Sequence, residues 1–332
     1  MTPHPLLAPW TLRDLRLQNR ILQAPLAGYG HLPFRLQCRI HGRPGLVATE
    51  MISAAALHQG NPRNAFYLER HPEEGPVQYQ LWGADPAHLA EGTRRCRDAG
   101  ADAVDLNSGC PVRKVLAAGA GVALMRDPAH LARCVAAMRG ATDAPVSAKI
   151  RLGPDPRTPN ALEVARAVED AGADLLTVHG RLGGEAYNVP ARADAIAAVV
   201  AAVGIPVVAN GDVADGPSAD RLQRATGCAG VMVGRACMGD PWVFARIRTE
   251  LAGAPWTPPT VAERGEALVA CYRMLHGRMG EDRATRHIRK LASFWSKGLP
   301  GARVYRLGLN DCPDAASFLR HTTAHFGLDD PA

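Results

Sequence analysis

One cysteine in the sequence has a setting that suits acid catalysis. Cys110 belongs to the segment Asn-Ser-Gly-Cys-Pro, residues 107–111, which places a carboxamide and a thiol three residues apart in a tight turn closed by proline. A thiol that keeps its proton at neutral pH can act as a general acid. A lone cysteine is more often structural, but this turn directly follows a β-rich run, where parallel barrels carry catalytic residues. We therefore predict that Cys110 is the catalytic acid.

Gln80 and Lys149 end two other β-rich runs. Their amide and ammonium groups could hydrogen-bond the edge of a flavin ring and stabilise negative charge on its reduced form. Lys149 has a competing role as a Schiff-base lysine, because barrel aldolases place a lysine similarly. A buried lysine without a partner is the least expected alternative, since burial of an unpaired charge is costly.

Two glycine-containing segments indicate a phosphate site. Asn210, Gly211 and Asp212 follow one β-rich run, and Gly234 and Arg235 follow the next. Glycine lets backbone N–H groups approach an anion, and arginine adds a positive charge. No G-x-G-x-x-G motif follows a run, so a Rossmann-type dinucleotide site is not indicated. A mononucleotide, FMN, is the expected cofactor.

Eight short β-rich runs carry these residues, and alanine-rich segments with helical periodicity separate them. The runs cover residues 20–25, 46–50, 77–81, 103–107, 146–150, 174–179, 206–210 and 230–234. Eight strand–helix units in about 240 residues favour a closed α/β TIM barrel, (β/α)8, over an open sheet. The polar residues that end the runs would then ring one pocket: Glu50, Gln80, Asn107, Lys149, His179, Asn210 and Arg235. The simpler interpretation is that polar residues mark where strands stop.

The character of the chain changes near Pro255. The segment PWTPP is a natural linker, and the remainder shows helical patterns without another β-rich run. We predict a catalytic barrel domain over residues 1–254 and a small helical domain over residues 255–332.

One predicted helix of the second domain has an apolar stripe made by Ile288, Leu291, Ala292 and Trp295. Four basic side chains fall largely outside this stripe: Arg286, Arg289, Lys290 and Lys297. They form either an ordinary solvated face or a contact surface for a phosphate backbone.

Composition limits the class of protein. Of 332 residues 47% are hydrophobic, enough for a large core. The eight cysteines include no C-x-x-C pair, so we expect no metal site and no disulfide framework.

The net charge of +6 is compatible with a polyanionic partner. The longest apolar run, residues 195–203, is too short to cross a membrane, and the N-terminus lacks signal-peptide features. We expect a cytoplasmic monomer.

The ordered motifs of the chain resemble those of the tRNA-dihydrouridine synthase family, and most of all its bacterial B-type branch. The similarity runs from about residue 9 to residue 319. It rests on RILQAPLAG (20–28), PFR (33–35), TEM (49–51), VQYQLWG (77–83), VDLNSGCP (104–111), KIRLG (149–153), TVHGR (177–181), IPVVANGDV (205–213) and GVMVGR (230–235). The DLN-x-GCP pattern is the most specific of these.

The resemblance implies a barrel that binds FMN, NADPH as the reductant, and a helical domain that holds tRNA. Residues matched to the family's flavin site are Pro25, Leu26, Ala27, Gln80, Lys149, His179, Asn210, Gly211, Asp212, Gly234 and Arg235. Asn107 would contact a flipped-out uracil. Flavin N5 would deliver hydride to uracil C6, and Cys110 would protonate C5. Arg286 and Lys290 would contact tRNA, and the B-type likeness suggests position 17 of the D-loop.

Several positions depart from the family pattern. Leu26 and Ser108 replace common methionines, Gly30 and His31 replace a Thr-Asp pair, and Leu182 replaces a threonine. None removes a group needed for the chemistry. Three rival functions remain open: a flavin reductase of a free small molecule, a Schiff-base enzyme acting on a phosphorylated sugar, and a non-catalytic RNA-binding relative.

Overall fold

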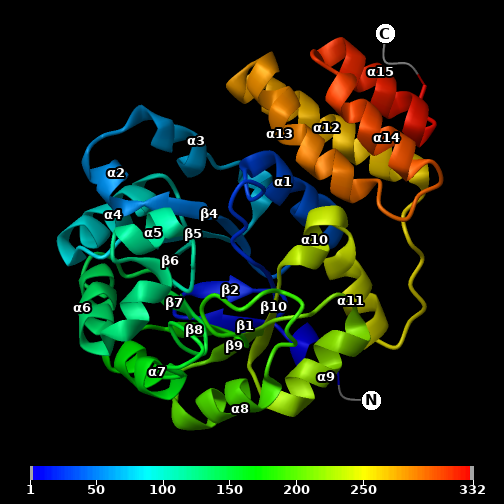
Figure 1. Ribbon diagram of the computed structural model, residues 1–332. Coiled ribbons are helices and arrows are strands. Elements are labelled where there is room, and N and C mark those ends of the chain that lie inside the picture. Colours follow the sequence, from blue (N-terminus) through cyan, green and yellow to red (C-terminus); the bar gives the residue numbers. More distant parts are fainter. Residues whose placement is uncertain (1–2, 330–332) are drawn as a thin grey trace.

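Eight parallel strands form the centre of the protein, for which we describe residues 3–329 of a computed structural model (Figure 1). The strands are β3 Ile21–Gln23, β4 Val47–Ser53, β5 Val77–Trp82, β6 Ala103–Ser108, β7 Val146–Ile150, β8 Leu175–His179, β9 Val207–Asn210 and β10 Gly230–Val233. They coincide with the eight β-rich runs to within a few residues. Such runs form strands because their apolar residues pack on both the helices outside and the barrel interior.

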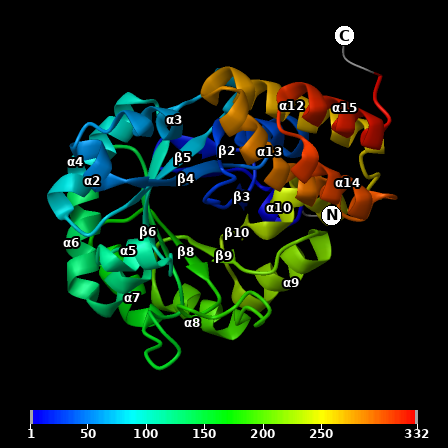
Figure 2. The same cartoon turned by 45° about the horizontal axis from the view of Figure 1, so that its top comes forward.

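The sheet closes on itself. Its strand order is β3-β10-β9-β8-β7-β6-β5-β4, and a parallel bridge between Leu22 and Leu46 joins the two ends. The N–H of Gln23 donates to the Leu46 carbonyl at 2.9 Å across this seam. The predicted TIM-barrel fold is therefore confirmed, and Figure 2 shows the strands enclosed by helices.

Helices follow the strands and pack outside them. The outer helices are α2 Ala54–His58, α4 Pro86–Asp98, α6 Pro128–Arg139, α7 Ala161–Asp170, α8 Ala193–Ala202, α9 Gly216–Thr226 and α11 Val243–Leu251. Shorter helices in the loops are α1 Leu32–Gln37, α3 Ala65–Leu68, α5 Arg113–Ala117 and α10 Arg235–Gly239. Short 3-10 or π turns occupy η1 Pro5–Leu7, η2 Cys38–Gly42, η3 Pro62–Asn64, η4 Pro72–Glu74, η5 Gly121–Arg126 and η6 Leu309–Asp311.

A two-stranded hairpin near the N-terminus was not predicted from the sequence. Strands β1 Trp10–Leu12 and β2 Leu15–Leu17 pair in antiparallel fashion. Trp10, Leu12 and Leu17 pack with barrel residues in one apolar cluster. Each strand has only three residues, too few for periodicity to be recognised, so burial against the barrel decides their structure.

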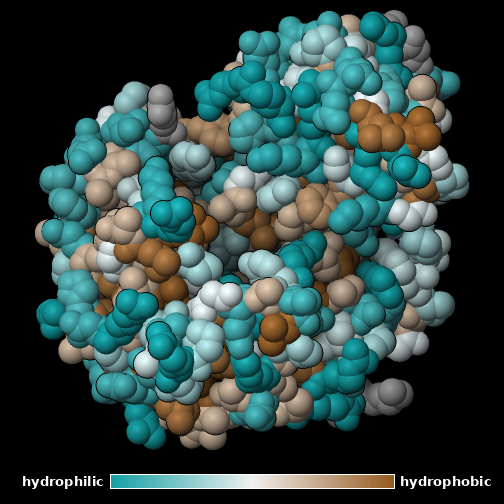
Figure 3. Space-filling model, viewed as in Figure 1, coloured by the Kyte–Doolittle hydropathy of each residue, from teal (hydrophilic) through white to brown (hydrophobic). Residues whose placement is uncertain are grey.

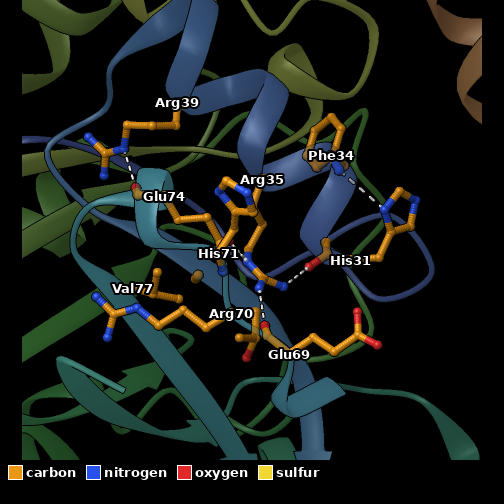
Figure 4. Close-up of polar contacts among 12 residues, drawn as sticks. His31, Phe34, Arg35, Arg39, Glu69, Arg70, His71, Glu74 and Val77 are labelled. Carbon is orange, nitrogen blue, oxygen red and sulfur yellow. Dashed lines mark hydrogen bonds and ion pairs between the residues drawn. The ribbon is translucent and has the colours of Figure 1, made fainter. Parts of the chain in front are cut away.

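A buried ion pair anchors α1 to the chain before β5 (Figure 4). Arg35 Nε lies 2.7 Å from Glu74 Oε1, and both side chains are almost fully buried. The guanidinium also donates to the carbonyl oxygens of Gly30 at 2.8 Å and Glu69 at 2.9 Å. These bonds satisfy a buried charge and fix the loop that leads from β3 into α1.

The last part of the chain is helical. Residues 254–260 have no regular secondary structure, and α12 Val261–Met279, α13 Glu281–Trp295, α14 Ala302–Gly308 and α15 Ala315–Phe326 follow. Of these helices, α12 lies beside α1 and α13 lies beside α10 (Figure 1). Trp295 Nε1 donates to the Met238 carbonyl at 2.9 Å, and the rings of Phe294 and Tyr29 meet edge to face at 5.8 Å. Helix α13 thus packs on the loops that follow the carboxyl ends of β3 and β10.

The predicted apolar stripe of α13 is buried, as its periodicity indicates: Ile288, Leu291, Ala292 and Trp295 are at most 1% exposed. Arg286 and Lys290 are exposed. Arg289 is an exception to the predicted basic face. It is only partly exposed and donates to the Cys312 carbonyl, so it ties α13 to the following segment.

Candidate active site

A cleft of about 1150 Å³ opens at the carboxyl ends of the strands. Figure 3 shows it as a hollow near the centre of this face. Nearly all of the residues predicted from the sequence line it: Pro25, Leu26, Ala27, Gln80, Asn107, Cys110, Lys149, His179, Asn210, Gly211, Asp212, Gly234 and Arg235. They come together because every strand of a parallel barrel ends on the same face.

Arg286 and Lys290 do not line the cleft. Both lie on the exposed face of α13, one helical turn apart. The Lys290 ammonium lies 3.9 Å from the position that a Cβ would occupy on Gly28. The basic face of α13 therefore adjoins the barrel loop that follows β3.

Cys110 is the only cysteine among the described residues that is not buried. Its backbone N–H donates to Asn107 Oδ1 at 3.0 Å, so the carboxamide fixes the turn that presents the thiol. Gly121 packs against this turn with φ +63°, and a Cβ there would lie 2.5 Å from the Cys110 carbonyl oxygen. Only glycine fits this position without a shift of the turn.

Lys149 and Asn210 form a polar pair in the cleft. Lys149 Nζ donates to Asn210 Oδ1 at 2.9 Å, and Asn210 Nδ2 donates to the Met232 carbonyl at 2.9 Å. Burial lowers the pKa of Lys149 to about 8, and Arg151 adds to this effect. The ammonium is still mostly protonated at neutral pH. That state suits stabilisation of negative charge better than nucleophilic attack.

A neutral histidine lies beside this pair. Burial lowers the pKa of His179 to about 2, and Lys149 and Arg151 contribute. Arg181 Nη1 lies 3.1 Å from His179 Nε2. Because a guanidinium can only donate, Nε2 is the acceptor and any ring proton is on Nδ1.

Asp212 joins two arginines in the cleft, and one of them, Arg181, also contacts His179. Arg181 Nη2 donates to both carboxylate oxygens, at 2.6 and 2.7 Å, and Arg235 Nη2 donates at 2.8 Å. Burial opposes ionisation of Asp212, but the hydrogen bonds from Arg181 and from the Ala191 N–H lower the pKa of this carboxyl. The negative charge of Asp212 balances part of the positive charge of Arg235. The sequence alone did not indicate that Arg235 has a carboxylate partner.

The Asn-Gly-Asp turn has a strained backbone that brings these groups together. Gly211 has φ +142°, and a Cβ there would lie 2.5 Å from Ala191 Cβ. Asp212 has φ +57°, which is uncommon for a residue with a side chain. The hydrogen bonds from Arg181 Nη2 to both carboxylate oxygens stabilise Asp212 in this conformation.

Among the cleft residues that were not assigned a site role from the sequence are Arg151, Arg181 and Tyr187. Arg151 and Arg181 lie within the quoted motifs, and each is almost fully buried at a strand end. Arg151 Nε donates to the Gly109 carbonyl at 2.9 Å. Tyr187 lies in a loop without a pattern, yet its ring sits 4.6 Å from the Arg235 guanidinium. An arginine one or two residues after a predicted strand could have been recognised in the sequence as a candidate site residue. No sequence pattern marked Tyr187.

In the part of the chain that is described, no cluster of three His, Cys, Asp or Glu side chains could hold a metal ion. Across residues 3–329, no helix is long and apolar enough to span a membrane.

Comparison with known proteins points to one family. A sequence model described as "Dihydrouridine synthase (Dus)" matches residues 22–326. The chain is 36% identical over 308 residues to tRNA-dihydrouridine synthase B of Xanthomonas campestris, covering 92% of each chain. It is 37% identical over 299 residues to tRNA-dihydrouridine synthase B of Pseudomonas aeruginosa, covering 90% of each. A probable tRNA-dihydrouridine synthase of Rhodobacter capsulatus is 39% identical over 289 residues, 86% of this chain and 89% of the relative.

Proposed function

The chain belongs to the dihydrouridine synthase family, and from this we propose that it reduces a D-loop uridine of tRNA to 5,6-dihydrouridine with FMN and NADPH. The observation that carries the proposal is the cleft that brings Cys110, Asn107 and Lys149 together on one barrel face. Position 17 is the proposed uridine. We also propose that the protein acts as a cytoplasmic monomer, with residues 1–254 as the catalytic domain and residues 255–332 as the tRNA-binding domain.

The side chains in the cleft fit FMN. Its lining includes an arginine, Arg235, with Gly211 and Gly234, which suits the phosphate. The lining also includes amide and ammonium donors, Gln80 and Lys149, and the apolar segment 25–27, which suits a flat polar-edged ring. When bound, FMN would supply the hydride that reduces the uracil double bond.

The protein's own residues have distinct tasks in this proposal. Lys149 provides a half-buried positive charge for the ring system, and neutral His179 lines the cleft without adding charge. Asn107 orients the uracil, and its hydrogen bond to the Cys110 N–H couples base binding to the position of the thiol. Cys110 donates the proton to uracil C5. The base must leave its stack for C5 and C6 to reach these groups.

The exposed cations of α13 support a nucleic-acid partner. Arg286 and Lys290 are exposed on a helix that also packs on the barrel, and Lys290 lies near the loop that follows β3. Phosphate contacts of this kind fix the register of a nucleic acid without reading its sequence. Which uridine is reduced would then depend on how the folded RNA is oriented.

The test is Cys110→Ala, examined in the two half-reactions separately by stopped flow. Reduction of the enzyme by NADPH should persist, because it needs no acid on the uracil side. Reoxidation of the reduced enzyme by tRNA should slow by about a hundredfold or more, as is typical for loss of a general acid. The control is Cys134→Ala, because Cys134 is buried and lies outside the cleft. Near-normal reoxidation of Cys110→Ala by tRNA would refute the assignment.

A further inference from the structure

A row of polar side chains crosses the barrel interior below the cleft. Gln80 on β5 pairs in register with Asp105 on β6, and Asp105 pairs with Ser147 on β7. All three side chains are at most 2% exposed. Gln80 and Asn107 line the cleft, whereas Asp105 is not among the described residues that line it.

The hydrogen bonds of this row have one direction. The Cys110 N–H donates to Asn107 Oδ1 at 3.0 Å, and Asn107 Nδ2 donates to Gln80 Oε1 at 2.8 Å. Gln80 Nε2 then donates to Asp105 Oδ2 at 2.7 Å. On its other side, Asp105 accepts from the Ser147 hydroxyl, which itself accepts from Gln78 Nε2 at 2.8 Å. Every donor in the row therefore points toward Asp105.

We propose that Asp105 is a positioning residue: through Gln80 it fixes the orientation of the Asn107 carboxamide and thereby the turn that carries Cys110. This inference rests on the proposed function for its effect on uracil reduction. The orientation of Asn107 and of the Cys110 turn by Asp105 does not depend on that function.

The direction of the row follows from the acceptor chemistry of a carboxylate. An ionised carboxylate can only accept hydrogen bonds, so Gln80 must turn its NH2 group toward Asp105 and its oxygen toward Asn107. Asn107 must then present its NH2 group to Gln80 and its oxygen to the Cys110 N–H. Burial raises the pKa of Asp105 to about 6, which leaves it mostly ionised at neutral pH. Without this anchor, the Gln80 amide is free to rotate.

The experiment compares Asp105→Ala with Ser147→Ala. Both remove a buried polar group from the same row, but Ser147 lies outside the path from Asp105 to Cys110. Asp105→Ala should slow reoxidation of the reduced enzyme by tRNA about tenfold or more, since small misplacement of a reacting group is costly. Ser147→Ala should stay close to wild type. Asp105→Asn should restore most of the rate, because its amide oxygen can still accept from Gln80.

A double-mutant cycle separates positioning from general destabilisation. If Asp105 acts through Asn107, adding Asp105→Ala to Asn107→Ala should slow the tRNA half-reaction little further. Additive losses, or equal losses in Asp105→Ala and Ser147→Ala at similar melting temperatures, would overturn the proposal.

A second readout needs neither tRNA nor cofactor. Cys110 is the only described cysteine that is not buried, so iodoacetamide should label it selectively in the folded protein. Asp105→Ala and Asn107→Ala should each raise the labelling rate several-fold, and Ser147→Ala should not. If tRNA fails to reoxidise the wild-type enzyme, the proposed function fails while this measurement still decides the role of Asp105. Equal labelling in all variants would refute that role.

Discussion

At the scale of single residues, Arg235 is the cation of the cleft whose role is easiest to isolate. It is exposed enough to meet a ligand, and its partners on the protein are Asp212 and both the ring and the carbonyl oxygen of Tyr187. Asp212 keeps a second arginine, Arg181, if Arg235 is removed. A substitution at Arg235 should therefore leave the Asn-Gly-Asp turn intact.

We predict that Arg235→Ala loses FMN on gel filtration, because the phosphate would lose its fixed positive charge. The released cofactor, measured by absorbance after denaturation, should be FMN, and wild-type protein should be yellow. Arg192→Ala is the matched control, since Arg192 pairs with Glu185 and does not line the cleft. Wild-type FMN content in Arg235→Ala would place the phosphate elsewhere. A colourless wild-type protein that FMN cannot reconstitute would exclude the flavin itself.

At the scale of elements, α13 combines two functions on opposite faces. Its apolar side, with Ile288 and Trp295, packs against the rest of the protein, while Arg286 and Lys290 are exposed. Arg289, between them in sequence, is engaged with the Cys312 carbonyl. The surface available to a polyanion is therefore narrower than the sequence indicates.

We predict that Arg286→Glu combined with Lys290→Glu weakens tRNA binding and flattens its salt dependence, because fewer counterions are released. NADPH oxidation by the enzyme should be unaffected. The control is Arg94→Glu with Arg166→Glu, which makes the same change of charge at exposed sites on α4 and α7. The affinity for tRNA, measured at several salt concentrations, distinguishes the α13 double variant from the control double variant. Equal affinity of the α13 variant and wild type would assign Arg286 and Lys290 to an ordinary solvated face.

At the scale of the whole molecule, barrel and helices share one continuous apolar core, which includes residues of both such as Val243, Phe244 and Ile288. His31 lies at their junction. It is 2% exposed, and its ring meets that of His287 on α13 at 6.3 Å. Its Nδ1 accepts from the Phe34 N–H at 3.2 Å and so caps α1 (Figure 4).

This histidine should make the stability of the protein sensitive to acid. Burial lowers the pKa of His31 to about 3, with His287 and Arg35 contributing. The unfolded chain takes up a proton near pH 6.5 and the folded protein does not, so the titration of His31 leaves stability unchanged well above pH 6.5 and lowers it progressively below that pH. We predict that the free energy of unfolding of wild type, relative to His31→Asn, falls by about 1.4 kcal/mol per pH unit below pH 6.5.

The measurement is denaturant unfolding of both proteins between pH 8 and pH 5. Asparagine can still accept from the Phe34 N–H but does not titrate, so the variant cancels the effects of all other groups. The difference should be constant above pH 7.5. A difference that stays constant down to pH 5 would mean that His31 is protonated in the folded protein.

The sequence by itself determined the barrel and the strand-end residues that line the cleft. The eight runs are short, apolar and separated by segments with helical periodicity, so local pattern and burial favour the same structure. Polar residues at their ends, such as Asn107 and Lys149, had to meet because parallel strands of a barrel end on one face. The predicted domain boundary and the role of each site residue stay predictions.

Only the tertiary structure decided which partners these residues have. The pairing of Arg235 with Asp212, the place of Tyr187 and the row that ends at Asp105 join residues far apart in sequence. The hairpin β1–β2 exists because the barrel buries it, and its three-residue strands carry too little local preference to be recognised. Strand pattern fixes which face a side chain occupies, whereas hydrogen-bond partners depend on register and loop path, which no single segment encodes.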